Sequence, residues 1–304
     1  MDILPRATPD EIKWGAAAIC GVMKKDAPFF IGRNGTIETD TLFHWFVSKD
    51  QPYPQQTLET ISKNAGVWPA TKESIDAWAE EYSRALGALD GLAAGWYEPN
   101  RTKEAALLEA FAPRAFTTPL RSLEPYYSEP ANRWTQYIAN KHVAVVTSFG
   151  ESVANQVNQA KKIWMNVDSP ETVLPSSAHW TPIQTYFAPA IAASGFGGWP
   201  SEHVKCWQDA VDWTVKRVEE SGATVAIIGC GGLGMIIAAR LKALGISAFV
   251  LGGATQVLFG IKGRRWQFHP IISKFWNVFW VWPLASEVPE GARKIEGGCY
   301  WGLN

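Results

Sequence analysis

Short apolar runs alternate with turns and amphipathic segments in the second half of the chain, and this alternation restricts the fold more than any other feature. Three apolar runs, each followed by a turn rich in glycine or serine, occupy residues 142–147, 224–228 and 247–251. Runs of this length predict buried strands, and the segment 235–244 between two of them predicts a helix. Strands that alternate with helices indicate an α/β fold with a mostly parallel sheet covered by helices on both faces.

Further elements are predicted along the rest of the chain. Residues 29–32 resemble a short strand that runs into a glycine turn. The apolar spacing predicts helices over 73–89, 132–139, 151–164 and 202–220, the last capped by Ser201. A length of 304 residues fits one domain, with an N-terminal half over 1–140 and a C-terminal half over 141–304 that carries the glycine-rich turns.

Composition excludes several classes of protein. The formal net charge is −1, whereas a nucleic-acid-binding protein usually has a strongly basic surface. The N-terminus lacks the pattern of a secretion signal, and no apolar run is long enough to span a membrane, so we expect a cytoplasmic location. The most apolar segment is 275–285. It is interpreted as a buried strand or core loop, with a surface patch for a membrane or a partner as the alternative.

Residues 229–234 match the pattern G-x-G-x-x-G, directly after a predicted strand and before a predicted helix. In that context, glycines such as Gly229, Gly231 and Gly232 let backbone N–H groups approach a phosphate at the positive end of a helix. The next strand ends at 250–253 without an acidic residue to hold a ribose, which argues against an NAD site. A tight turn that binds nothing is the structural alternative.

Two more turns at predicted strand ends are candidates for ligand binding. The first combines glycines and an amide with a basic cluster: Gly252, Gly253, Gln256, Lys262, Arg264 and Arg265. Arginine can bind a diphosphate through two parallel hydrogen bonds, although a solvated basic turn is equally consistent with this pattern. The second turn is Ser148, Phe149, Gly150 and Glu151, which either contacts the ligand or only caps the helix that follows.

The turn after the first predicted strand resembles a known family. The segment 33–38, from Arg33 to Glu38, is similar to the R-x-G-[DST]-x-E turn of the GT-D-type glycosyltransferases and their relatives in bacterial and large-virus glycan assembly. The segments 64–69, 252–266 and 296–301 resemble the same group, and 252–266 is the most specific of them. Without the resemblance, the turn at 33–38 would be interpreted as a salt-bridged turn.

The resemblance implies a Rossmann-like enzyme of glycan biosynthesis, a hexosyl- or deoxyhexosyl-transferase. Its donor would be a nucleoside-diphosphate sugar and its acceptor an oligosaccharide or glycan. In that family an Asp-x-Glu pair in this turn binds Mn²⁺ or Mg²⁺ at the donor diphosphate. Here Thr36 replaces the first acid and Glu38 matches the second, so metal dependence is left open.

These residues allow more than one function. Glu38 is predicted either to activate the acceptor as a base or to hold a metal, and Arg33 is the second candidate catalytic residue. The first alternative function is an NAD-type oxidoreductase on the same fold. The second is a non-catalytic nucleotide-sugar or glycan-assembly scaffold, which the substituted acid at Thr36 would fit.

Overall fold

The computed structural model describes residues 7–185 and 204–302. Within them, one seven-stranded sheet has the order β3-β2-β1-β7-β6-β4-β5, and its pairings are parallel. The strands are β1 (Phe30–Gly32), β2 (Gly91–Ala93), β3 (Phe116–Thr118), β4 (His142–Thr147), β5 (His179–Gln184), β6 (Val225–Gly229) and β7 (Ser247–Val250). The predicted α/β, Rossmann-like fold is confirmed, and both halves of the chain contribute strands to the same sheet.

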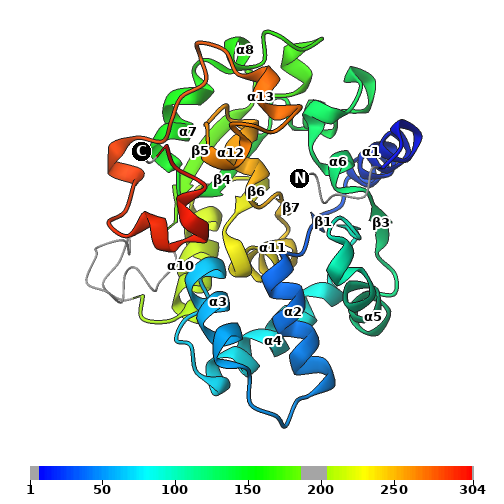
Figure 1. The fold of residues 1–304 in the computed structure, drawn as a ribbon. Helices are drawn as coiled ribbons and strands as arrows, with labels where there is room; N and C mark the ends of the chain where they lie inside the picture. The colour runs from blue at the N-terminus through cyan, green and yellow to red at the C-terminus, as the bar shows by residue number, and fades with distance from the viewer. Residues whose placement is uncertain (1–6, 186–203, 303–304) are drawn as a thin grey trace.

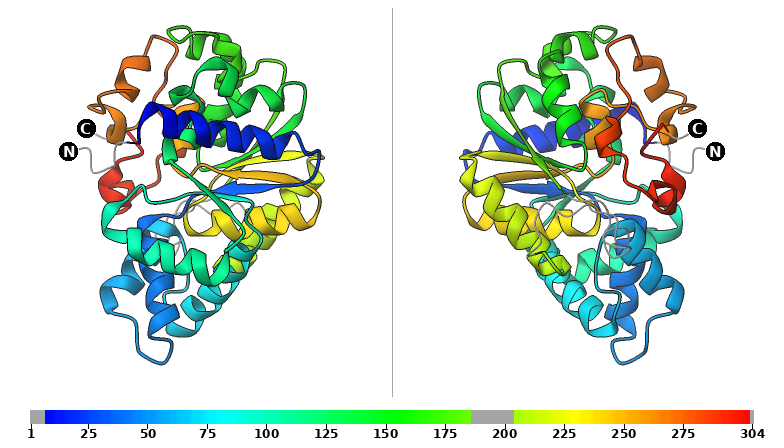
Figure 2. Two further views of the ribbon diagram at one scale, coloured as in Figure 1. Left: turned by 90° about the vertical axis from the view of Figure 1, so that its right-hand side faces the viewer. Right: turned by 90° about the vertical axis from the view of Figure 1, so that its left-hand side faces the viewer.

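Helices cover both faces of this sheet, as the edge-on views of Figure 2 show. In the first half of the chain they are α1 (Pro9–Met23), α2 (Thr36–Val47), α3 (Gln55–Ala65), α4 (Lys72–Gly87), α5 (Arg101–Phe111) and α6 (Leu120–Leu123). In the second half they are α7 (Gly150–Val157), α8 (Ala160–Ile163), α10 (Trp207–Glu220), α11 (Gly234–Ala243), α12 (Ala254–Leu258) and α13 (Ile272–Phe275). Figure 1 looks onto the sheet from the edge where the strands end.

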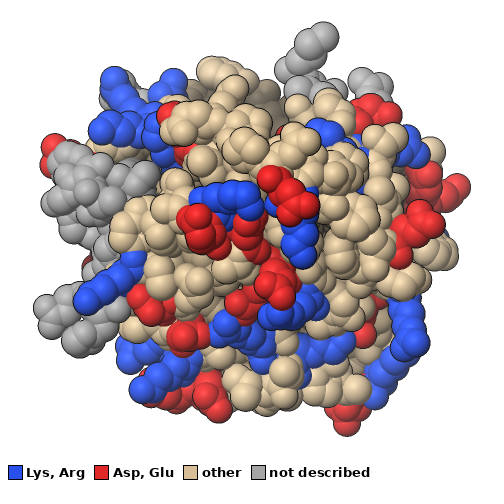
Figure 3. Space-filling view, turned by 90° about the horizontal axis from the view of Figure 1, so that it is seen from below, with Lys and Arg blue, Asp and Glu red and all other residues tan. Residues whose placement is uncertain are grey.

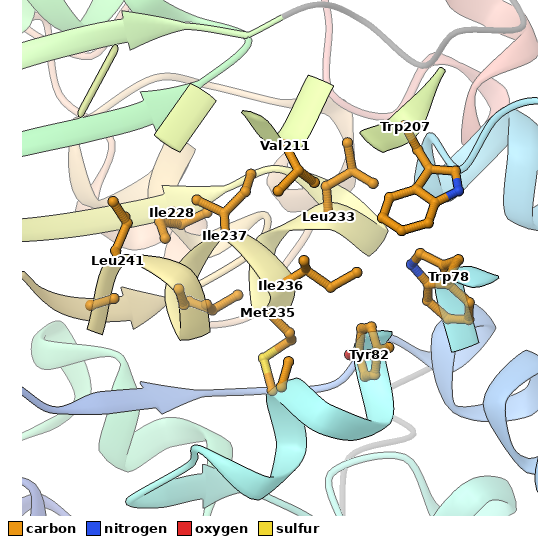
Figure 4. Close-up of a cluster of buried hydrophobic side chains, with 14 of the residues drawn as sticks. Trp78, Tyr82, Trp207, Val211, Ile228, Leu233, Met235, Ile236, Ile237 and Leu241 are labelled. Carbon is orange, nitrogen blue, oxygen red and sulfur yellow. The ribbon is translucent and has the colours of Figure 1, made fainter. Parts of the chain in front are cut away.

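The two faces of the sheet bury separate cores because neighbouring residues of a strand point to opposite sides. In β4, Ala144 and Val146 join a core with α4, α10 and α11, whereas Val143 and Val145 join the core on the side of α1 and α7. Figure 4 shows the first core, where Trp78 of α4 lies close to Trp207 of α10. Strands buried on both faces have few polar positions, which is why they stand out in the sequence.

Several predicted elements are confirmed and others are wrong. The helices predicted over 73–89 and 235–244 correspond to α4 and α11. The helix predicted over 132–139 is instead a pair of 3₁₀ turns, where Trp134 is fully buried and donates its Nε1–H to the Leu123 carbonyl over 2.9 Å. The helix predicted over 151–164 is split into α7 and α8. The helix predicted from 202 begins at Trp207, and the proposed cap Ser201 lies outside the described residues.

The apolar segment 275–285 fits both of its interpretations in part. Trp280 is buried and its Nε1–H donates to the Ile163 carbonyl over 2.9 Å. Val278 is 88% exposed, and Trp282 is 38% exposed. One side of this segment therefore belongs to the core and the other faces solvent.

Charged side chains of both signs are interspersed on the face of α2, α3 and α4, which Figure 3 shows from below. Among the described residues, no helix combines the length and the apolar character needed to cross a membrane.

Candidate functional site

A cavity of about 270 Å³ lies at the carboxyl edge of the sheet, beyond the ends of β1, β4, β6 and β7. The strand order reverses at this point, because β1 leads outward to β2 while its other neighbour is β7. Loops that leave adjacent strands in opposite directions open a crevice, which is where parallel α/β sheets bind ligands. Figures 1 and 2 show the last segment of the chain, in red, at this same end of the molecule.

The cavity brings together most of the residues predicted from the sequence. It is lined by Arg33, Glu38, Ser148, Phe149, Gly229, Gly231, Gly252, Gly253, Gln256 and Arg265. Gly150, Glu151, Gly232, Lys262 and Arg264 are not among its lining residues.

Arg33 is the dominant positive group in the cavity. Its guanidinium carbon lies 4.4 Å from the centre of the Trp96 ring, in a cation–π contact. A Cβ on Gly252 would lie 2.7 Å from Arg33 Nη1, so the guanidinium lies across the end of β7 where only a glycine leaves room. Among the described residues, the buried Arg33 Nε has no hydrogen-bond partner, and no carboxylate forms an ion pair with the guanidinium. A half-buried guanidinium that forms no close ion pair is suited to bind an anion.

A buried hydrogen-bond network holds this arginine and its tryptophan in place. Asn34 donates from Nδ2 to Glu104 Oε1 over 3.0 Å and accepts from the Tyr82 hydroxyl over 2.9 Å. The other Glu104 oxygen accepts from the Gly95 N–H over 2.6 Å, directly before Trp96. The Trp96 Nε1–H donates to the Asn34 carbonyl over 3.2 Å. The turns that follow β1 and β2 are thus fixed to one another.

Glu38 occupies the third position of α2, with Gly35 as the N-cap residue. Its carboxylate folds back over that residue, because a Cβ on Gly35 would lie 1.8 Å from Glu38 Oε2. Burial raises the pKa of the Glu38 carboxyl, the nearby Glu296 raises it further, and the charge of Arg33 lowers it. An acid in the first turn also stabilises a helix. The same carboxylate is therefore both a helix-stabilising group and a candidate base.

The glycine loop after β6 is used largely for packing. A Cβ on Gly231, which has a φ of +46°, would lie 2.7 Å from the carbonyl oxygen of Ala65 at the end of α3. Gly232 packs against the same helix end and accepts a hydrogen bond from Trp78 Nε1 over 2.9 Å. Contacts within the chain account for these two glycines. Of the predicted phosphate-binding loop, Gly229 and Gly231 line the cavity.

Polar side chains with uncommitted atoms lie at the opposite wall. Gln256 is 2% exposed and donates from Nε2 to the carbonyls of Lys262 and Tyr300, each over 2.8 Å. Its Oε1 and the Thr255 hydroxyl are buried and have no hydrogen-bond partner among the described residues. Because a buried polar atom without a partner costs free energy, these two atoms are available to accept or donate hydrogen bonds to a polar group that enters the cavity.

The turn after β4 contributes only its first half. Ser148 and Phe149 line the cavity, and the Ser148 hydroxyl lies 3.1 Å from the Thr185 hydroxyl. The Gly150 N–H donates to Gln184 Oε1 over 2.7 Å, and Glu151 accepts from the Ser286 hydroxyl over 2.6 Å. Gly150 and Glu151 therefore hold the start of α7 against neighbouring segments.

The predicted basic cluster does not converge on one site. Arg265 reaches the cavity, where its guanidinium is ion-paired with Glu296 and lies 4.7 Å from the Tyr300 ring centre. The Lys262 ammonium lies 5.5 Å from the Trp276 ring centre, outside the cavity, and Arg264 is exposed. The 3₁₀ turn Arg264–Trp266 points its successive side chains in different directions, which local spacing does not reveal.

Several lining residues were missed as site residues by the sequence analysis. Trp96 and Thr185 line the cavity without belonging to any motif, whereas Cys230 and Thr255 lie within the segments 229–234 and 252–266 but were not predicted as site residues. The wall residues around Asn64 and from Glu296 to Trp301 fall in segments that resemble the glycosyltransferase family, and only that resemblance drew attention to them.

The donor set for a divalent metal is incomplete. The lining carboxylates are Glu38 and Glu296, and Glu296 is engaged by Arg265 and by the Tyr300 hydroxyl, 3.1 Å from its Oε1. Among the described residues, no group of three or more His, Cys, Asp or Glu side chains is placed to hold a metal ion. Glu38 alone, beside the cation Arg33, does not fit a metal site, and we derive no step through a metal.

Comparison with known proteins adds no further information, since no protein-family model, curated protein or solved structure matches the chain.

Proposed function

We propose that the chain is a glycosyltransferase that takes a sugar from a nucleoside-diphosphate sugar and transfers it to a saccharide acceptor. The observation that supports this most strongly is Arg33, a half-buried arginine without an ion-pair partner among the described residues, in the crevice at the carboxyl edge of a parallel sheet. The negative charge of a diphosphate would pair with the Arg33 guanidinium. Two phosphate oxygens can also accept two parallel N–H hydrogen bonds from that group.

In this proposal each group around that arginine has a role. Arg33 stabilises the charge that develops on the departing nucleoside diphosphate. The unpaired Gln256 Oε1 and Thr255 hydroxyl bind sugar or ribose hydroxyls. Glu38 accepts the proton of the acceptor hydroxyl. The hydroxyl oxygen of the acceptor attacks the anomeric carbon of the donor sugar, and the bond between that carbon and the diphosphate breaks. A base with a raised pKa is suited to this task near neutral pH.

A ligand screen followed by a turnover assay tests the proposal. UDP, GDP and dTDP are compared by thermal unfolding, each with Mn²⁺ and with EDTA. A ligand at 100 times its Kd should stabilise the fold by about 2.7 kcal/mol. Hydrolysis or transfer of the corresponding nucleotide sugar then separates an enzyme from a non-catalytic scaffold. The proposal fails if none of the diphosphates raises the melting temperature.

NAD and NADP are expected not to bind specifically. The strand β7 ends at Val250 and is followed by Leu251 and Gly252, so no acidic side chain is placed there to accept hydrogen bonds from a ribose. The Ala65 carbonyl also fills the space beside Gly231, the second glycine of the dinucleotide pattern. Calorimetry with both cofactors checks this expectation, and tight binding of either would favour the oxidoreductase instead.

Arg265→Ala is expected to weaken nucleoside-diphosphate binding by about tenfold to a hundredfold, the scale of one charge-assisted hydrogen bond. Arg264→Ala is the matched control, because Arg264 belongs to the same 3₁₀ turn but is exposed outside the cavity. Calorimetry measures the affinity of the variant for UDP and for uridine, which lacks the diphosphate. A loss of affinity for UDP alone identifies a contact between Arg265 and phosphate. Equal losses for both ligands would mean that Arg265, through its pair with Glu296, only supports the cavity wall.

A further inference from the structure

A second cavity of about 480 Å³ opens beside the first, at the ends of β2 and β3. The start of α1 forms one side of it, and the turns that follow the two strands form the other. Its lining includes Glu11, Trp14, Trp96, Arg101, Thr117 and Arg121. This cavity belongs to the same carboxyl edge of the sheet as the site described above.

Trp96 is common to both cavities. The Arg33 guanidinium lies over its ring at 4.4 Å, and the indole N–H is fixed to the Asn34 carbonyl. A group bound in the second cavity therefore lies next to the wall that carries Arg33. A transfer between two substrates requires that both are held close together. Two adjacent cavities that share Trp96 as a lining residue would meet this requirement.

The lining of the second cavity combines aromatic and basic groups. Trp14 is 60% exposed, which is unusual for so large an apolar side chain, and its indole offers an apolar surface to the cavity, where Trp96 is the other tryptophan of the lining. Arg101 has only a solvent-exposed ion pair with Glu98, at 3.6 Å, and such pairs are weak. Only one oxygen of the Glu11 carboxylate, Oε2, accepts hydrogen bonds, from the Thr8 N–H and hydroxyl over 2.7 and 2.9 Å; these hold the negative charge at the start of α1, so the acidic group of a ligand must bind on the Arg101 side of the cavity.

We propose that this second cavity is the acceptor subsite and that it takes an acidic saccharide, one that carries a carboxylate or a phosphate. Sugar rings have apolar faces that pack on indole, and Arg101 supplies a charge for the acidic group. The inference rests on the proposed function, because it assigns the acceptor of that same transfer. It adds the chemical class of the acceptor and the residues that select it.

Ligand-detected NMR with glucuronate, glucose 6-phosphate and glucose tests the proposal on the full chain. Both acidic sugars are expected to bind at least tenfold more tightly than glucose. Trp14→Ala and Arg101→Gln should each weaken acidic-sugar binding by roughly tenfold, the scale of one aromatic or charge-assisted contact. UDP affinity, measured by calorimetry, should not change in either variant.

Two matched variants serve as controls. Trp282→Ala removes another exposed tryptophan and Arg114→Gln another exposed arginine, and neither residue lines a described cavity. Both should bind acidic sugars as the unmodified chain does. Equal affinity for acidic and neutral sugars overturns the proposal, as does acidic-sugar binding that persists in Trp14→Ala. If acidic sugars bind through Trp14 but no nucleoside diphosphate binds, the proposed transferase is refuted and the acceptor role falls with it.

Discussion

Arg33→Gln is expected to weaken the binding of a nucleoside diphosphate by roughly 10²–10⁴-fold, the loss of two charge-assisted hydrogen bonds to phosphate. The physical reason is that Arg33 has no ion-pair partner among the described residues, so its charge is available to a ligand. Calorimetry with UDP, GDP or dTDP measures the effect. Arg33→Lys should restore only part of the affinity, because an ammonium cannot make the two parallel contacts of a guanidinium.

The stability of the variant provides the necessary control. Loss of the half-buried Arg33–Trp96 contact should reduce the free energy of unfolding by about 0.5–2 kcal/mol, the range between an exposed and a desolvated cation–π pair. Arg264→Gln, outside the cavity, should leave diphosphate binding unchanged. If Arg33→Gln binds the diphosphate as well as the unmodified chain does, Arg33 is not the diphosphate-binding residue, and the proposed function loses its main support. A variant that unfolds at low denaturant would instead show that Arg33 is a structural residue.

Glu38→Gln is expected to reduce turnover by about 10²–10⁴-fold, the usual contribution of a general base. The amide keeps the shape of the side chain over Gly35 but cannot accept the proton. Glu73→Gln is the matched control. Glu73 is an exposed acid in the first turn of α4, so its substitution removes a helix-stabilising charge away from the cavity and should leave turnover unchanged. Turnover in EDTA and across a Mn²⁺ titration separates the two predicted roles of Glu38. Activity that survives EDTA but is lost in Glu38→Gln supports the base.

The raised pKa of Glu38 gives this prediction a pH dependence. The base acts when it is deprotonated, so turnover should rise with pH as it passes through that pKa. The folded state holds this proton more tightly than the unfolded state, so Glu38 reduces stability as the pH rises above the ordinary carboxyl pKa. Glu38→Gln removes that effect, and its melting temperature at pH 8 should equal or exceed that of the unmodified chain. A clear drop at pH 8, with none for Glu73→Gln, would identify Glu38 as a structural residue.

The sequence by itself was sufficient to predict a mostly parallel sheet and to place the glycine-rich turns at its carboxyl edge. The runs at 142–147, 224–228 and 247–251 became β4, β6 and β7, because strands buried on both faces need continuous apolar residues. Their glycine and serine turns all lie at the carboxyl edge, since parallel strands end together. The strands β2 and β3 were missed because each has only three residues and neither contains a run of bulky apolar side chains such as Phe29, Phe30 and Ile31 at the equally short β1.

Only the tertiary structure decided which polar residues share a cavity. Lys262, Arg264 and Arg265 are neighbours in the sequence, but a 3₁₀ turn sends one of them into the cavity and leaves the others outside. Gly231 looked like a phosphate-binding glycine, yet it admits the carbonyl of Ala65 from a helix far away in the sequence. Local patterns record whether a side chain is buried and how the backbone turns. They do not indicate which other residues a side chain contacts, because those contacts depend on chain crossovers that bring distant segments together.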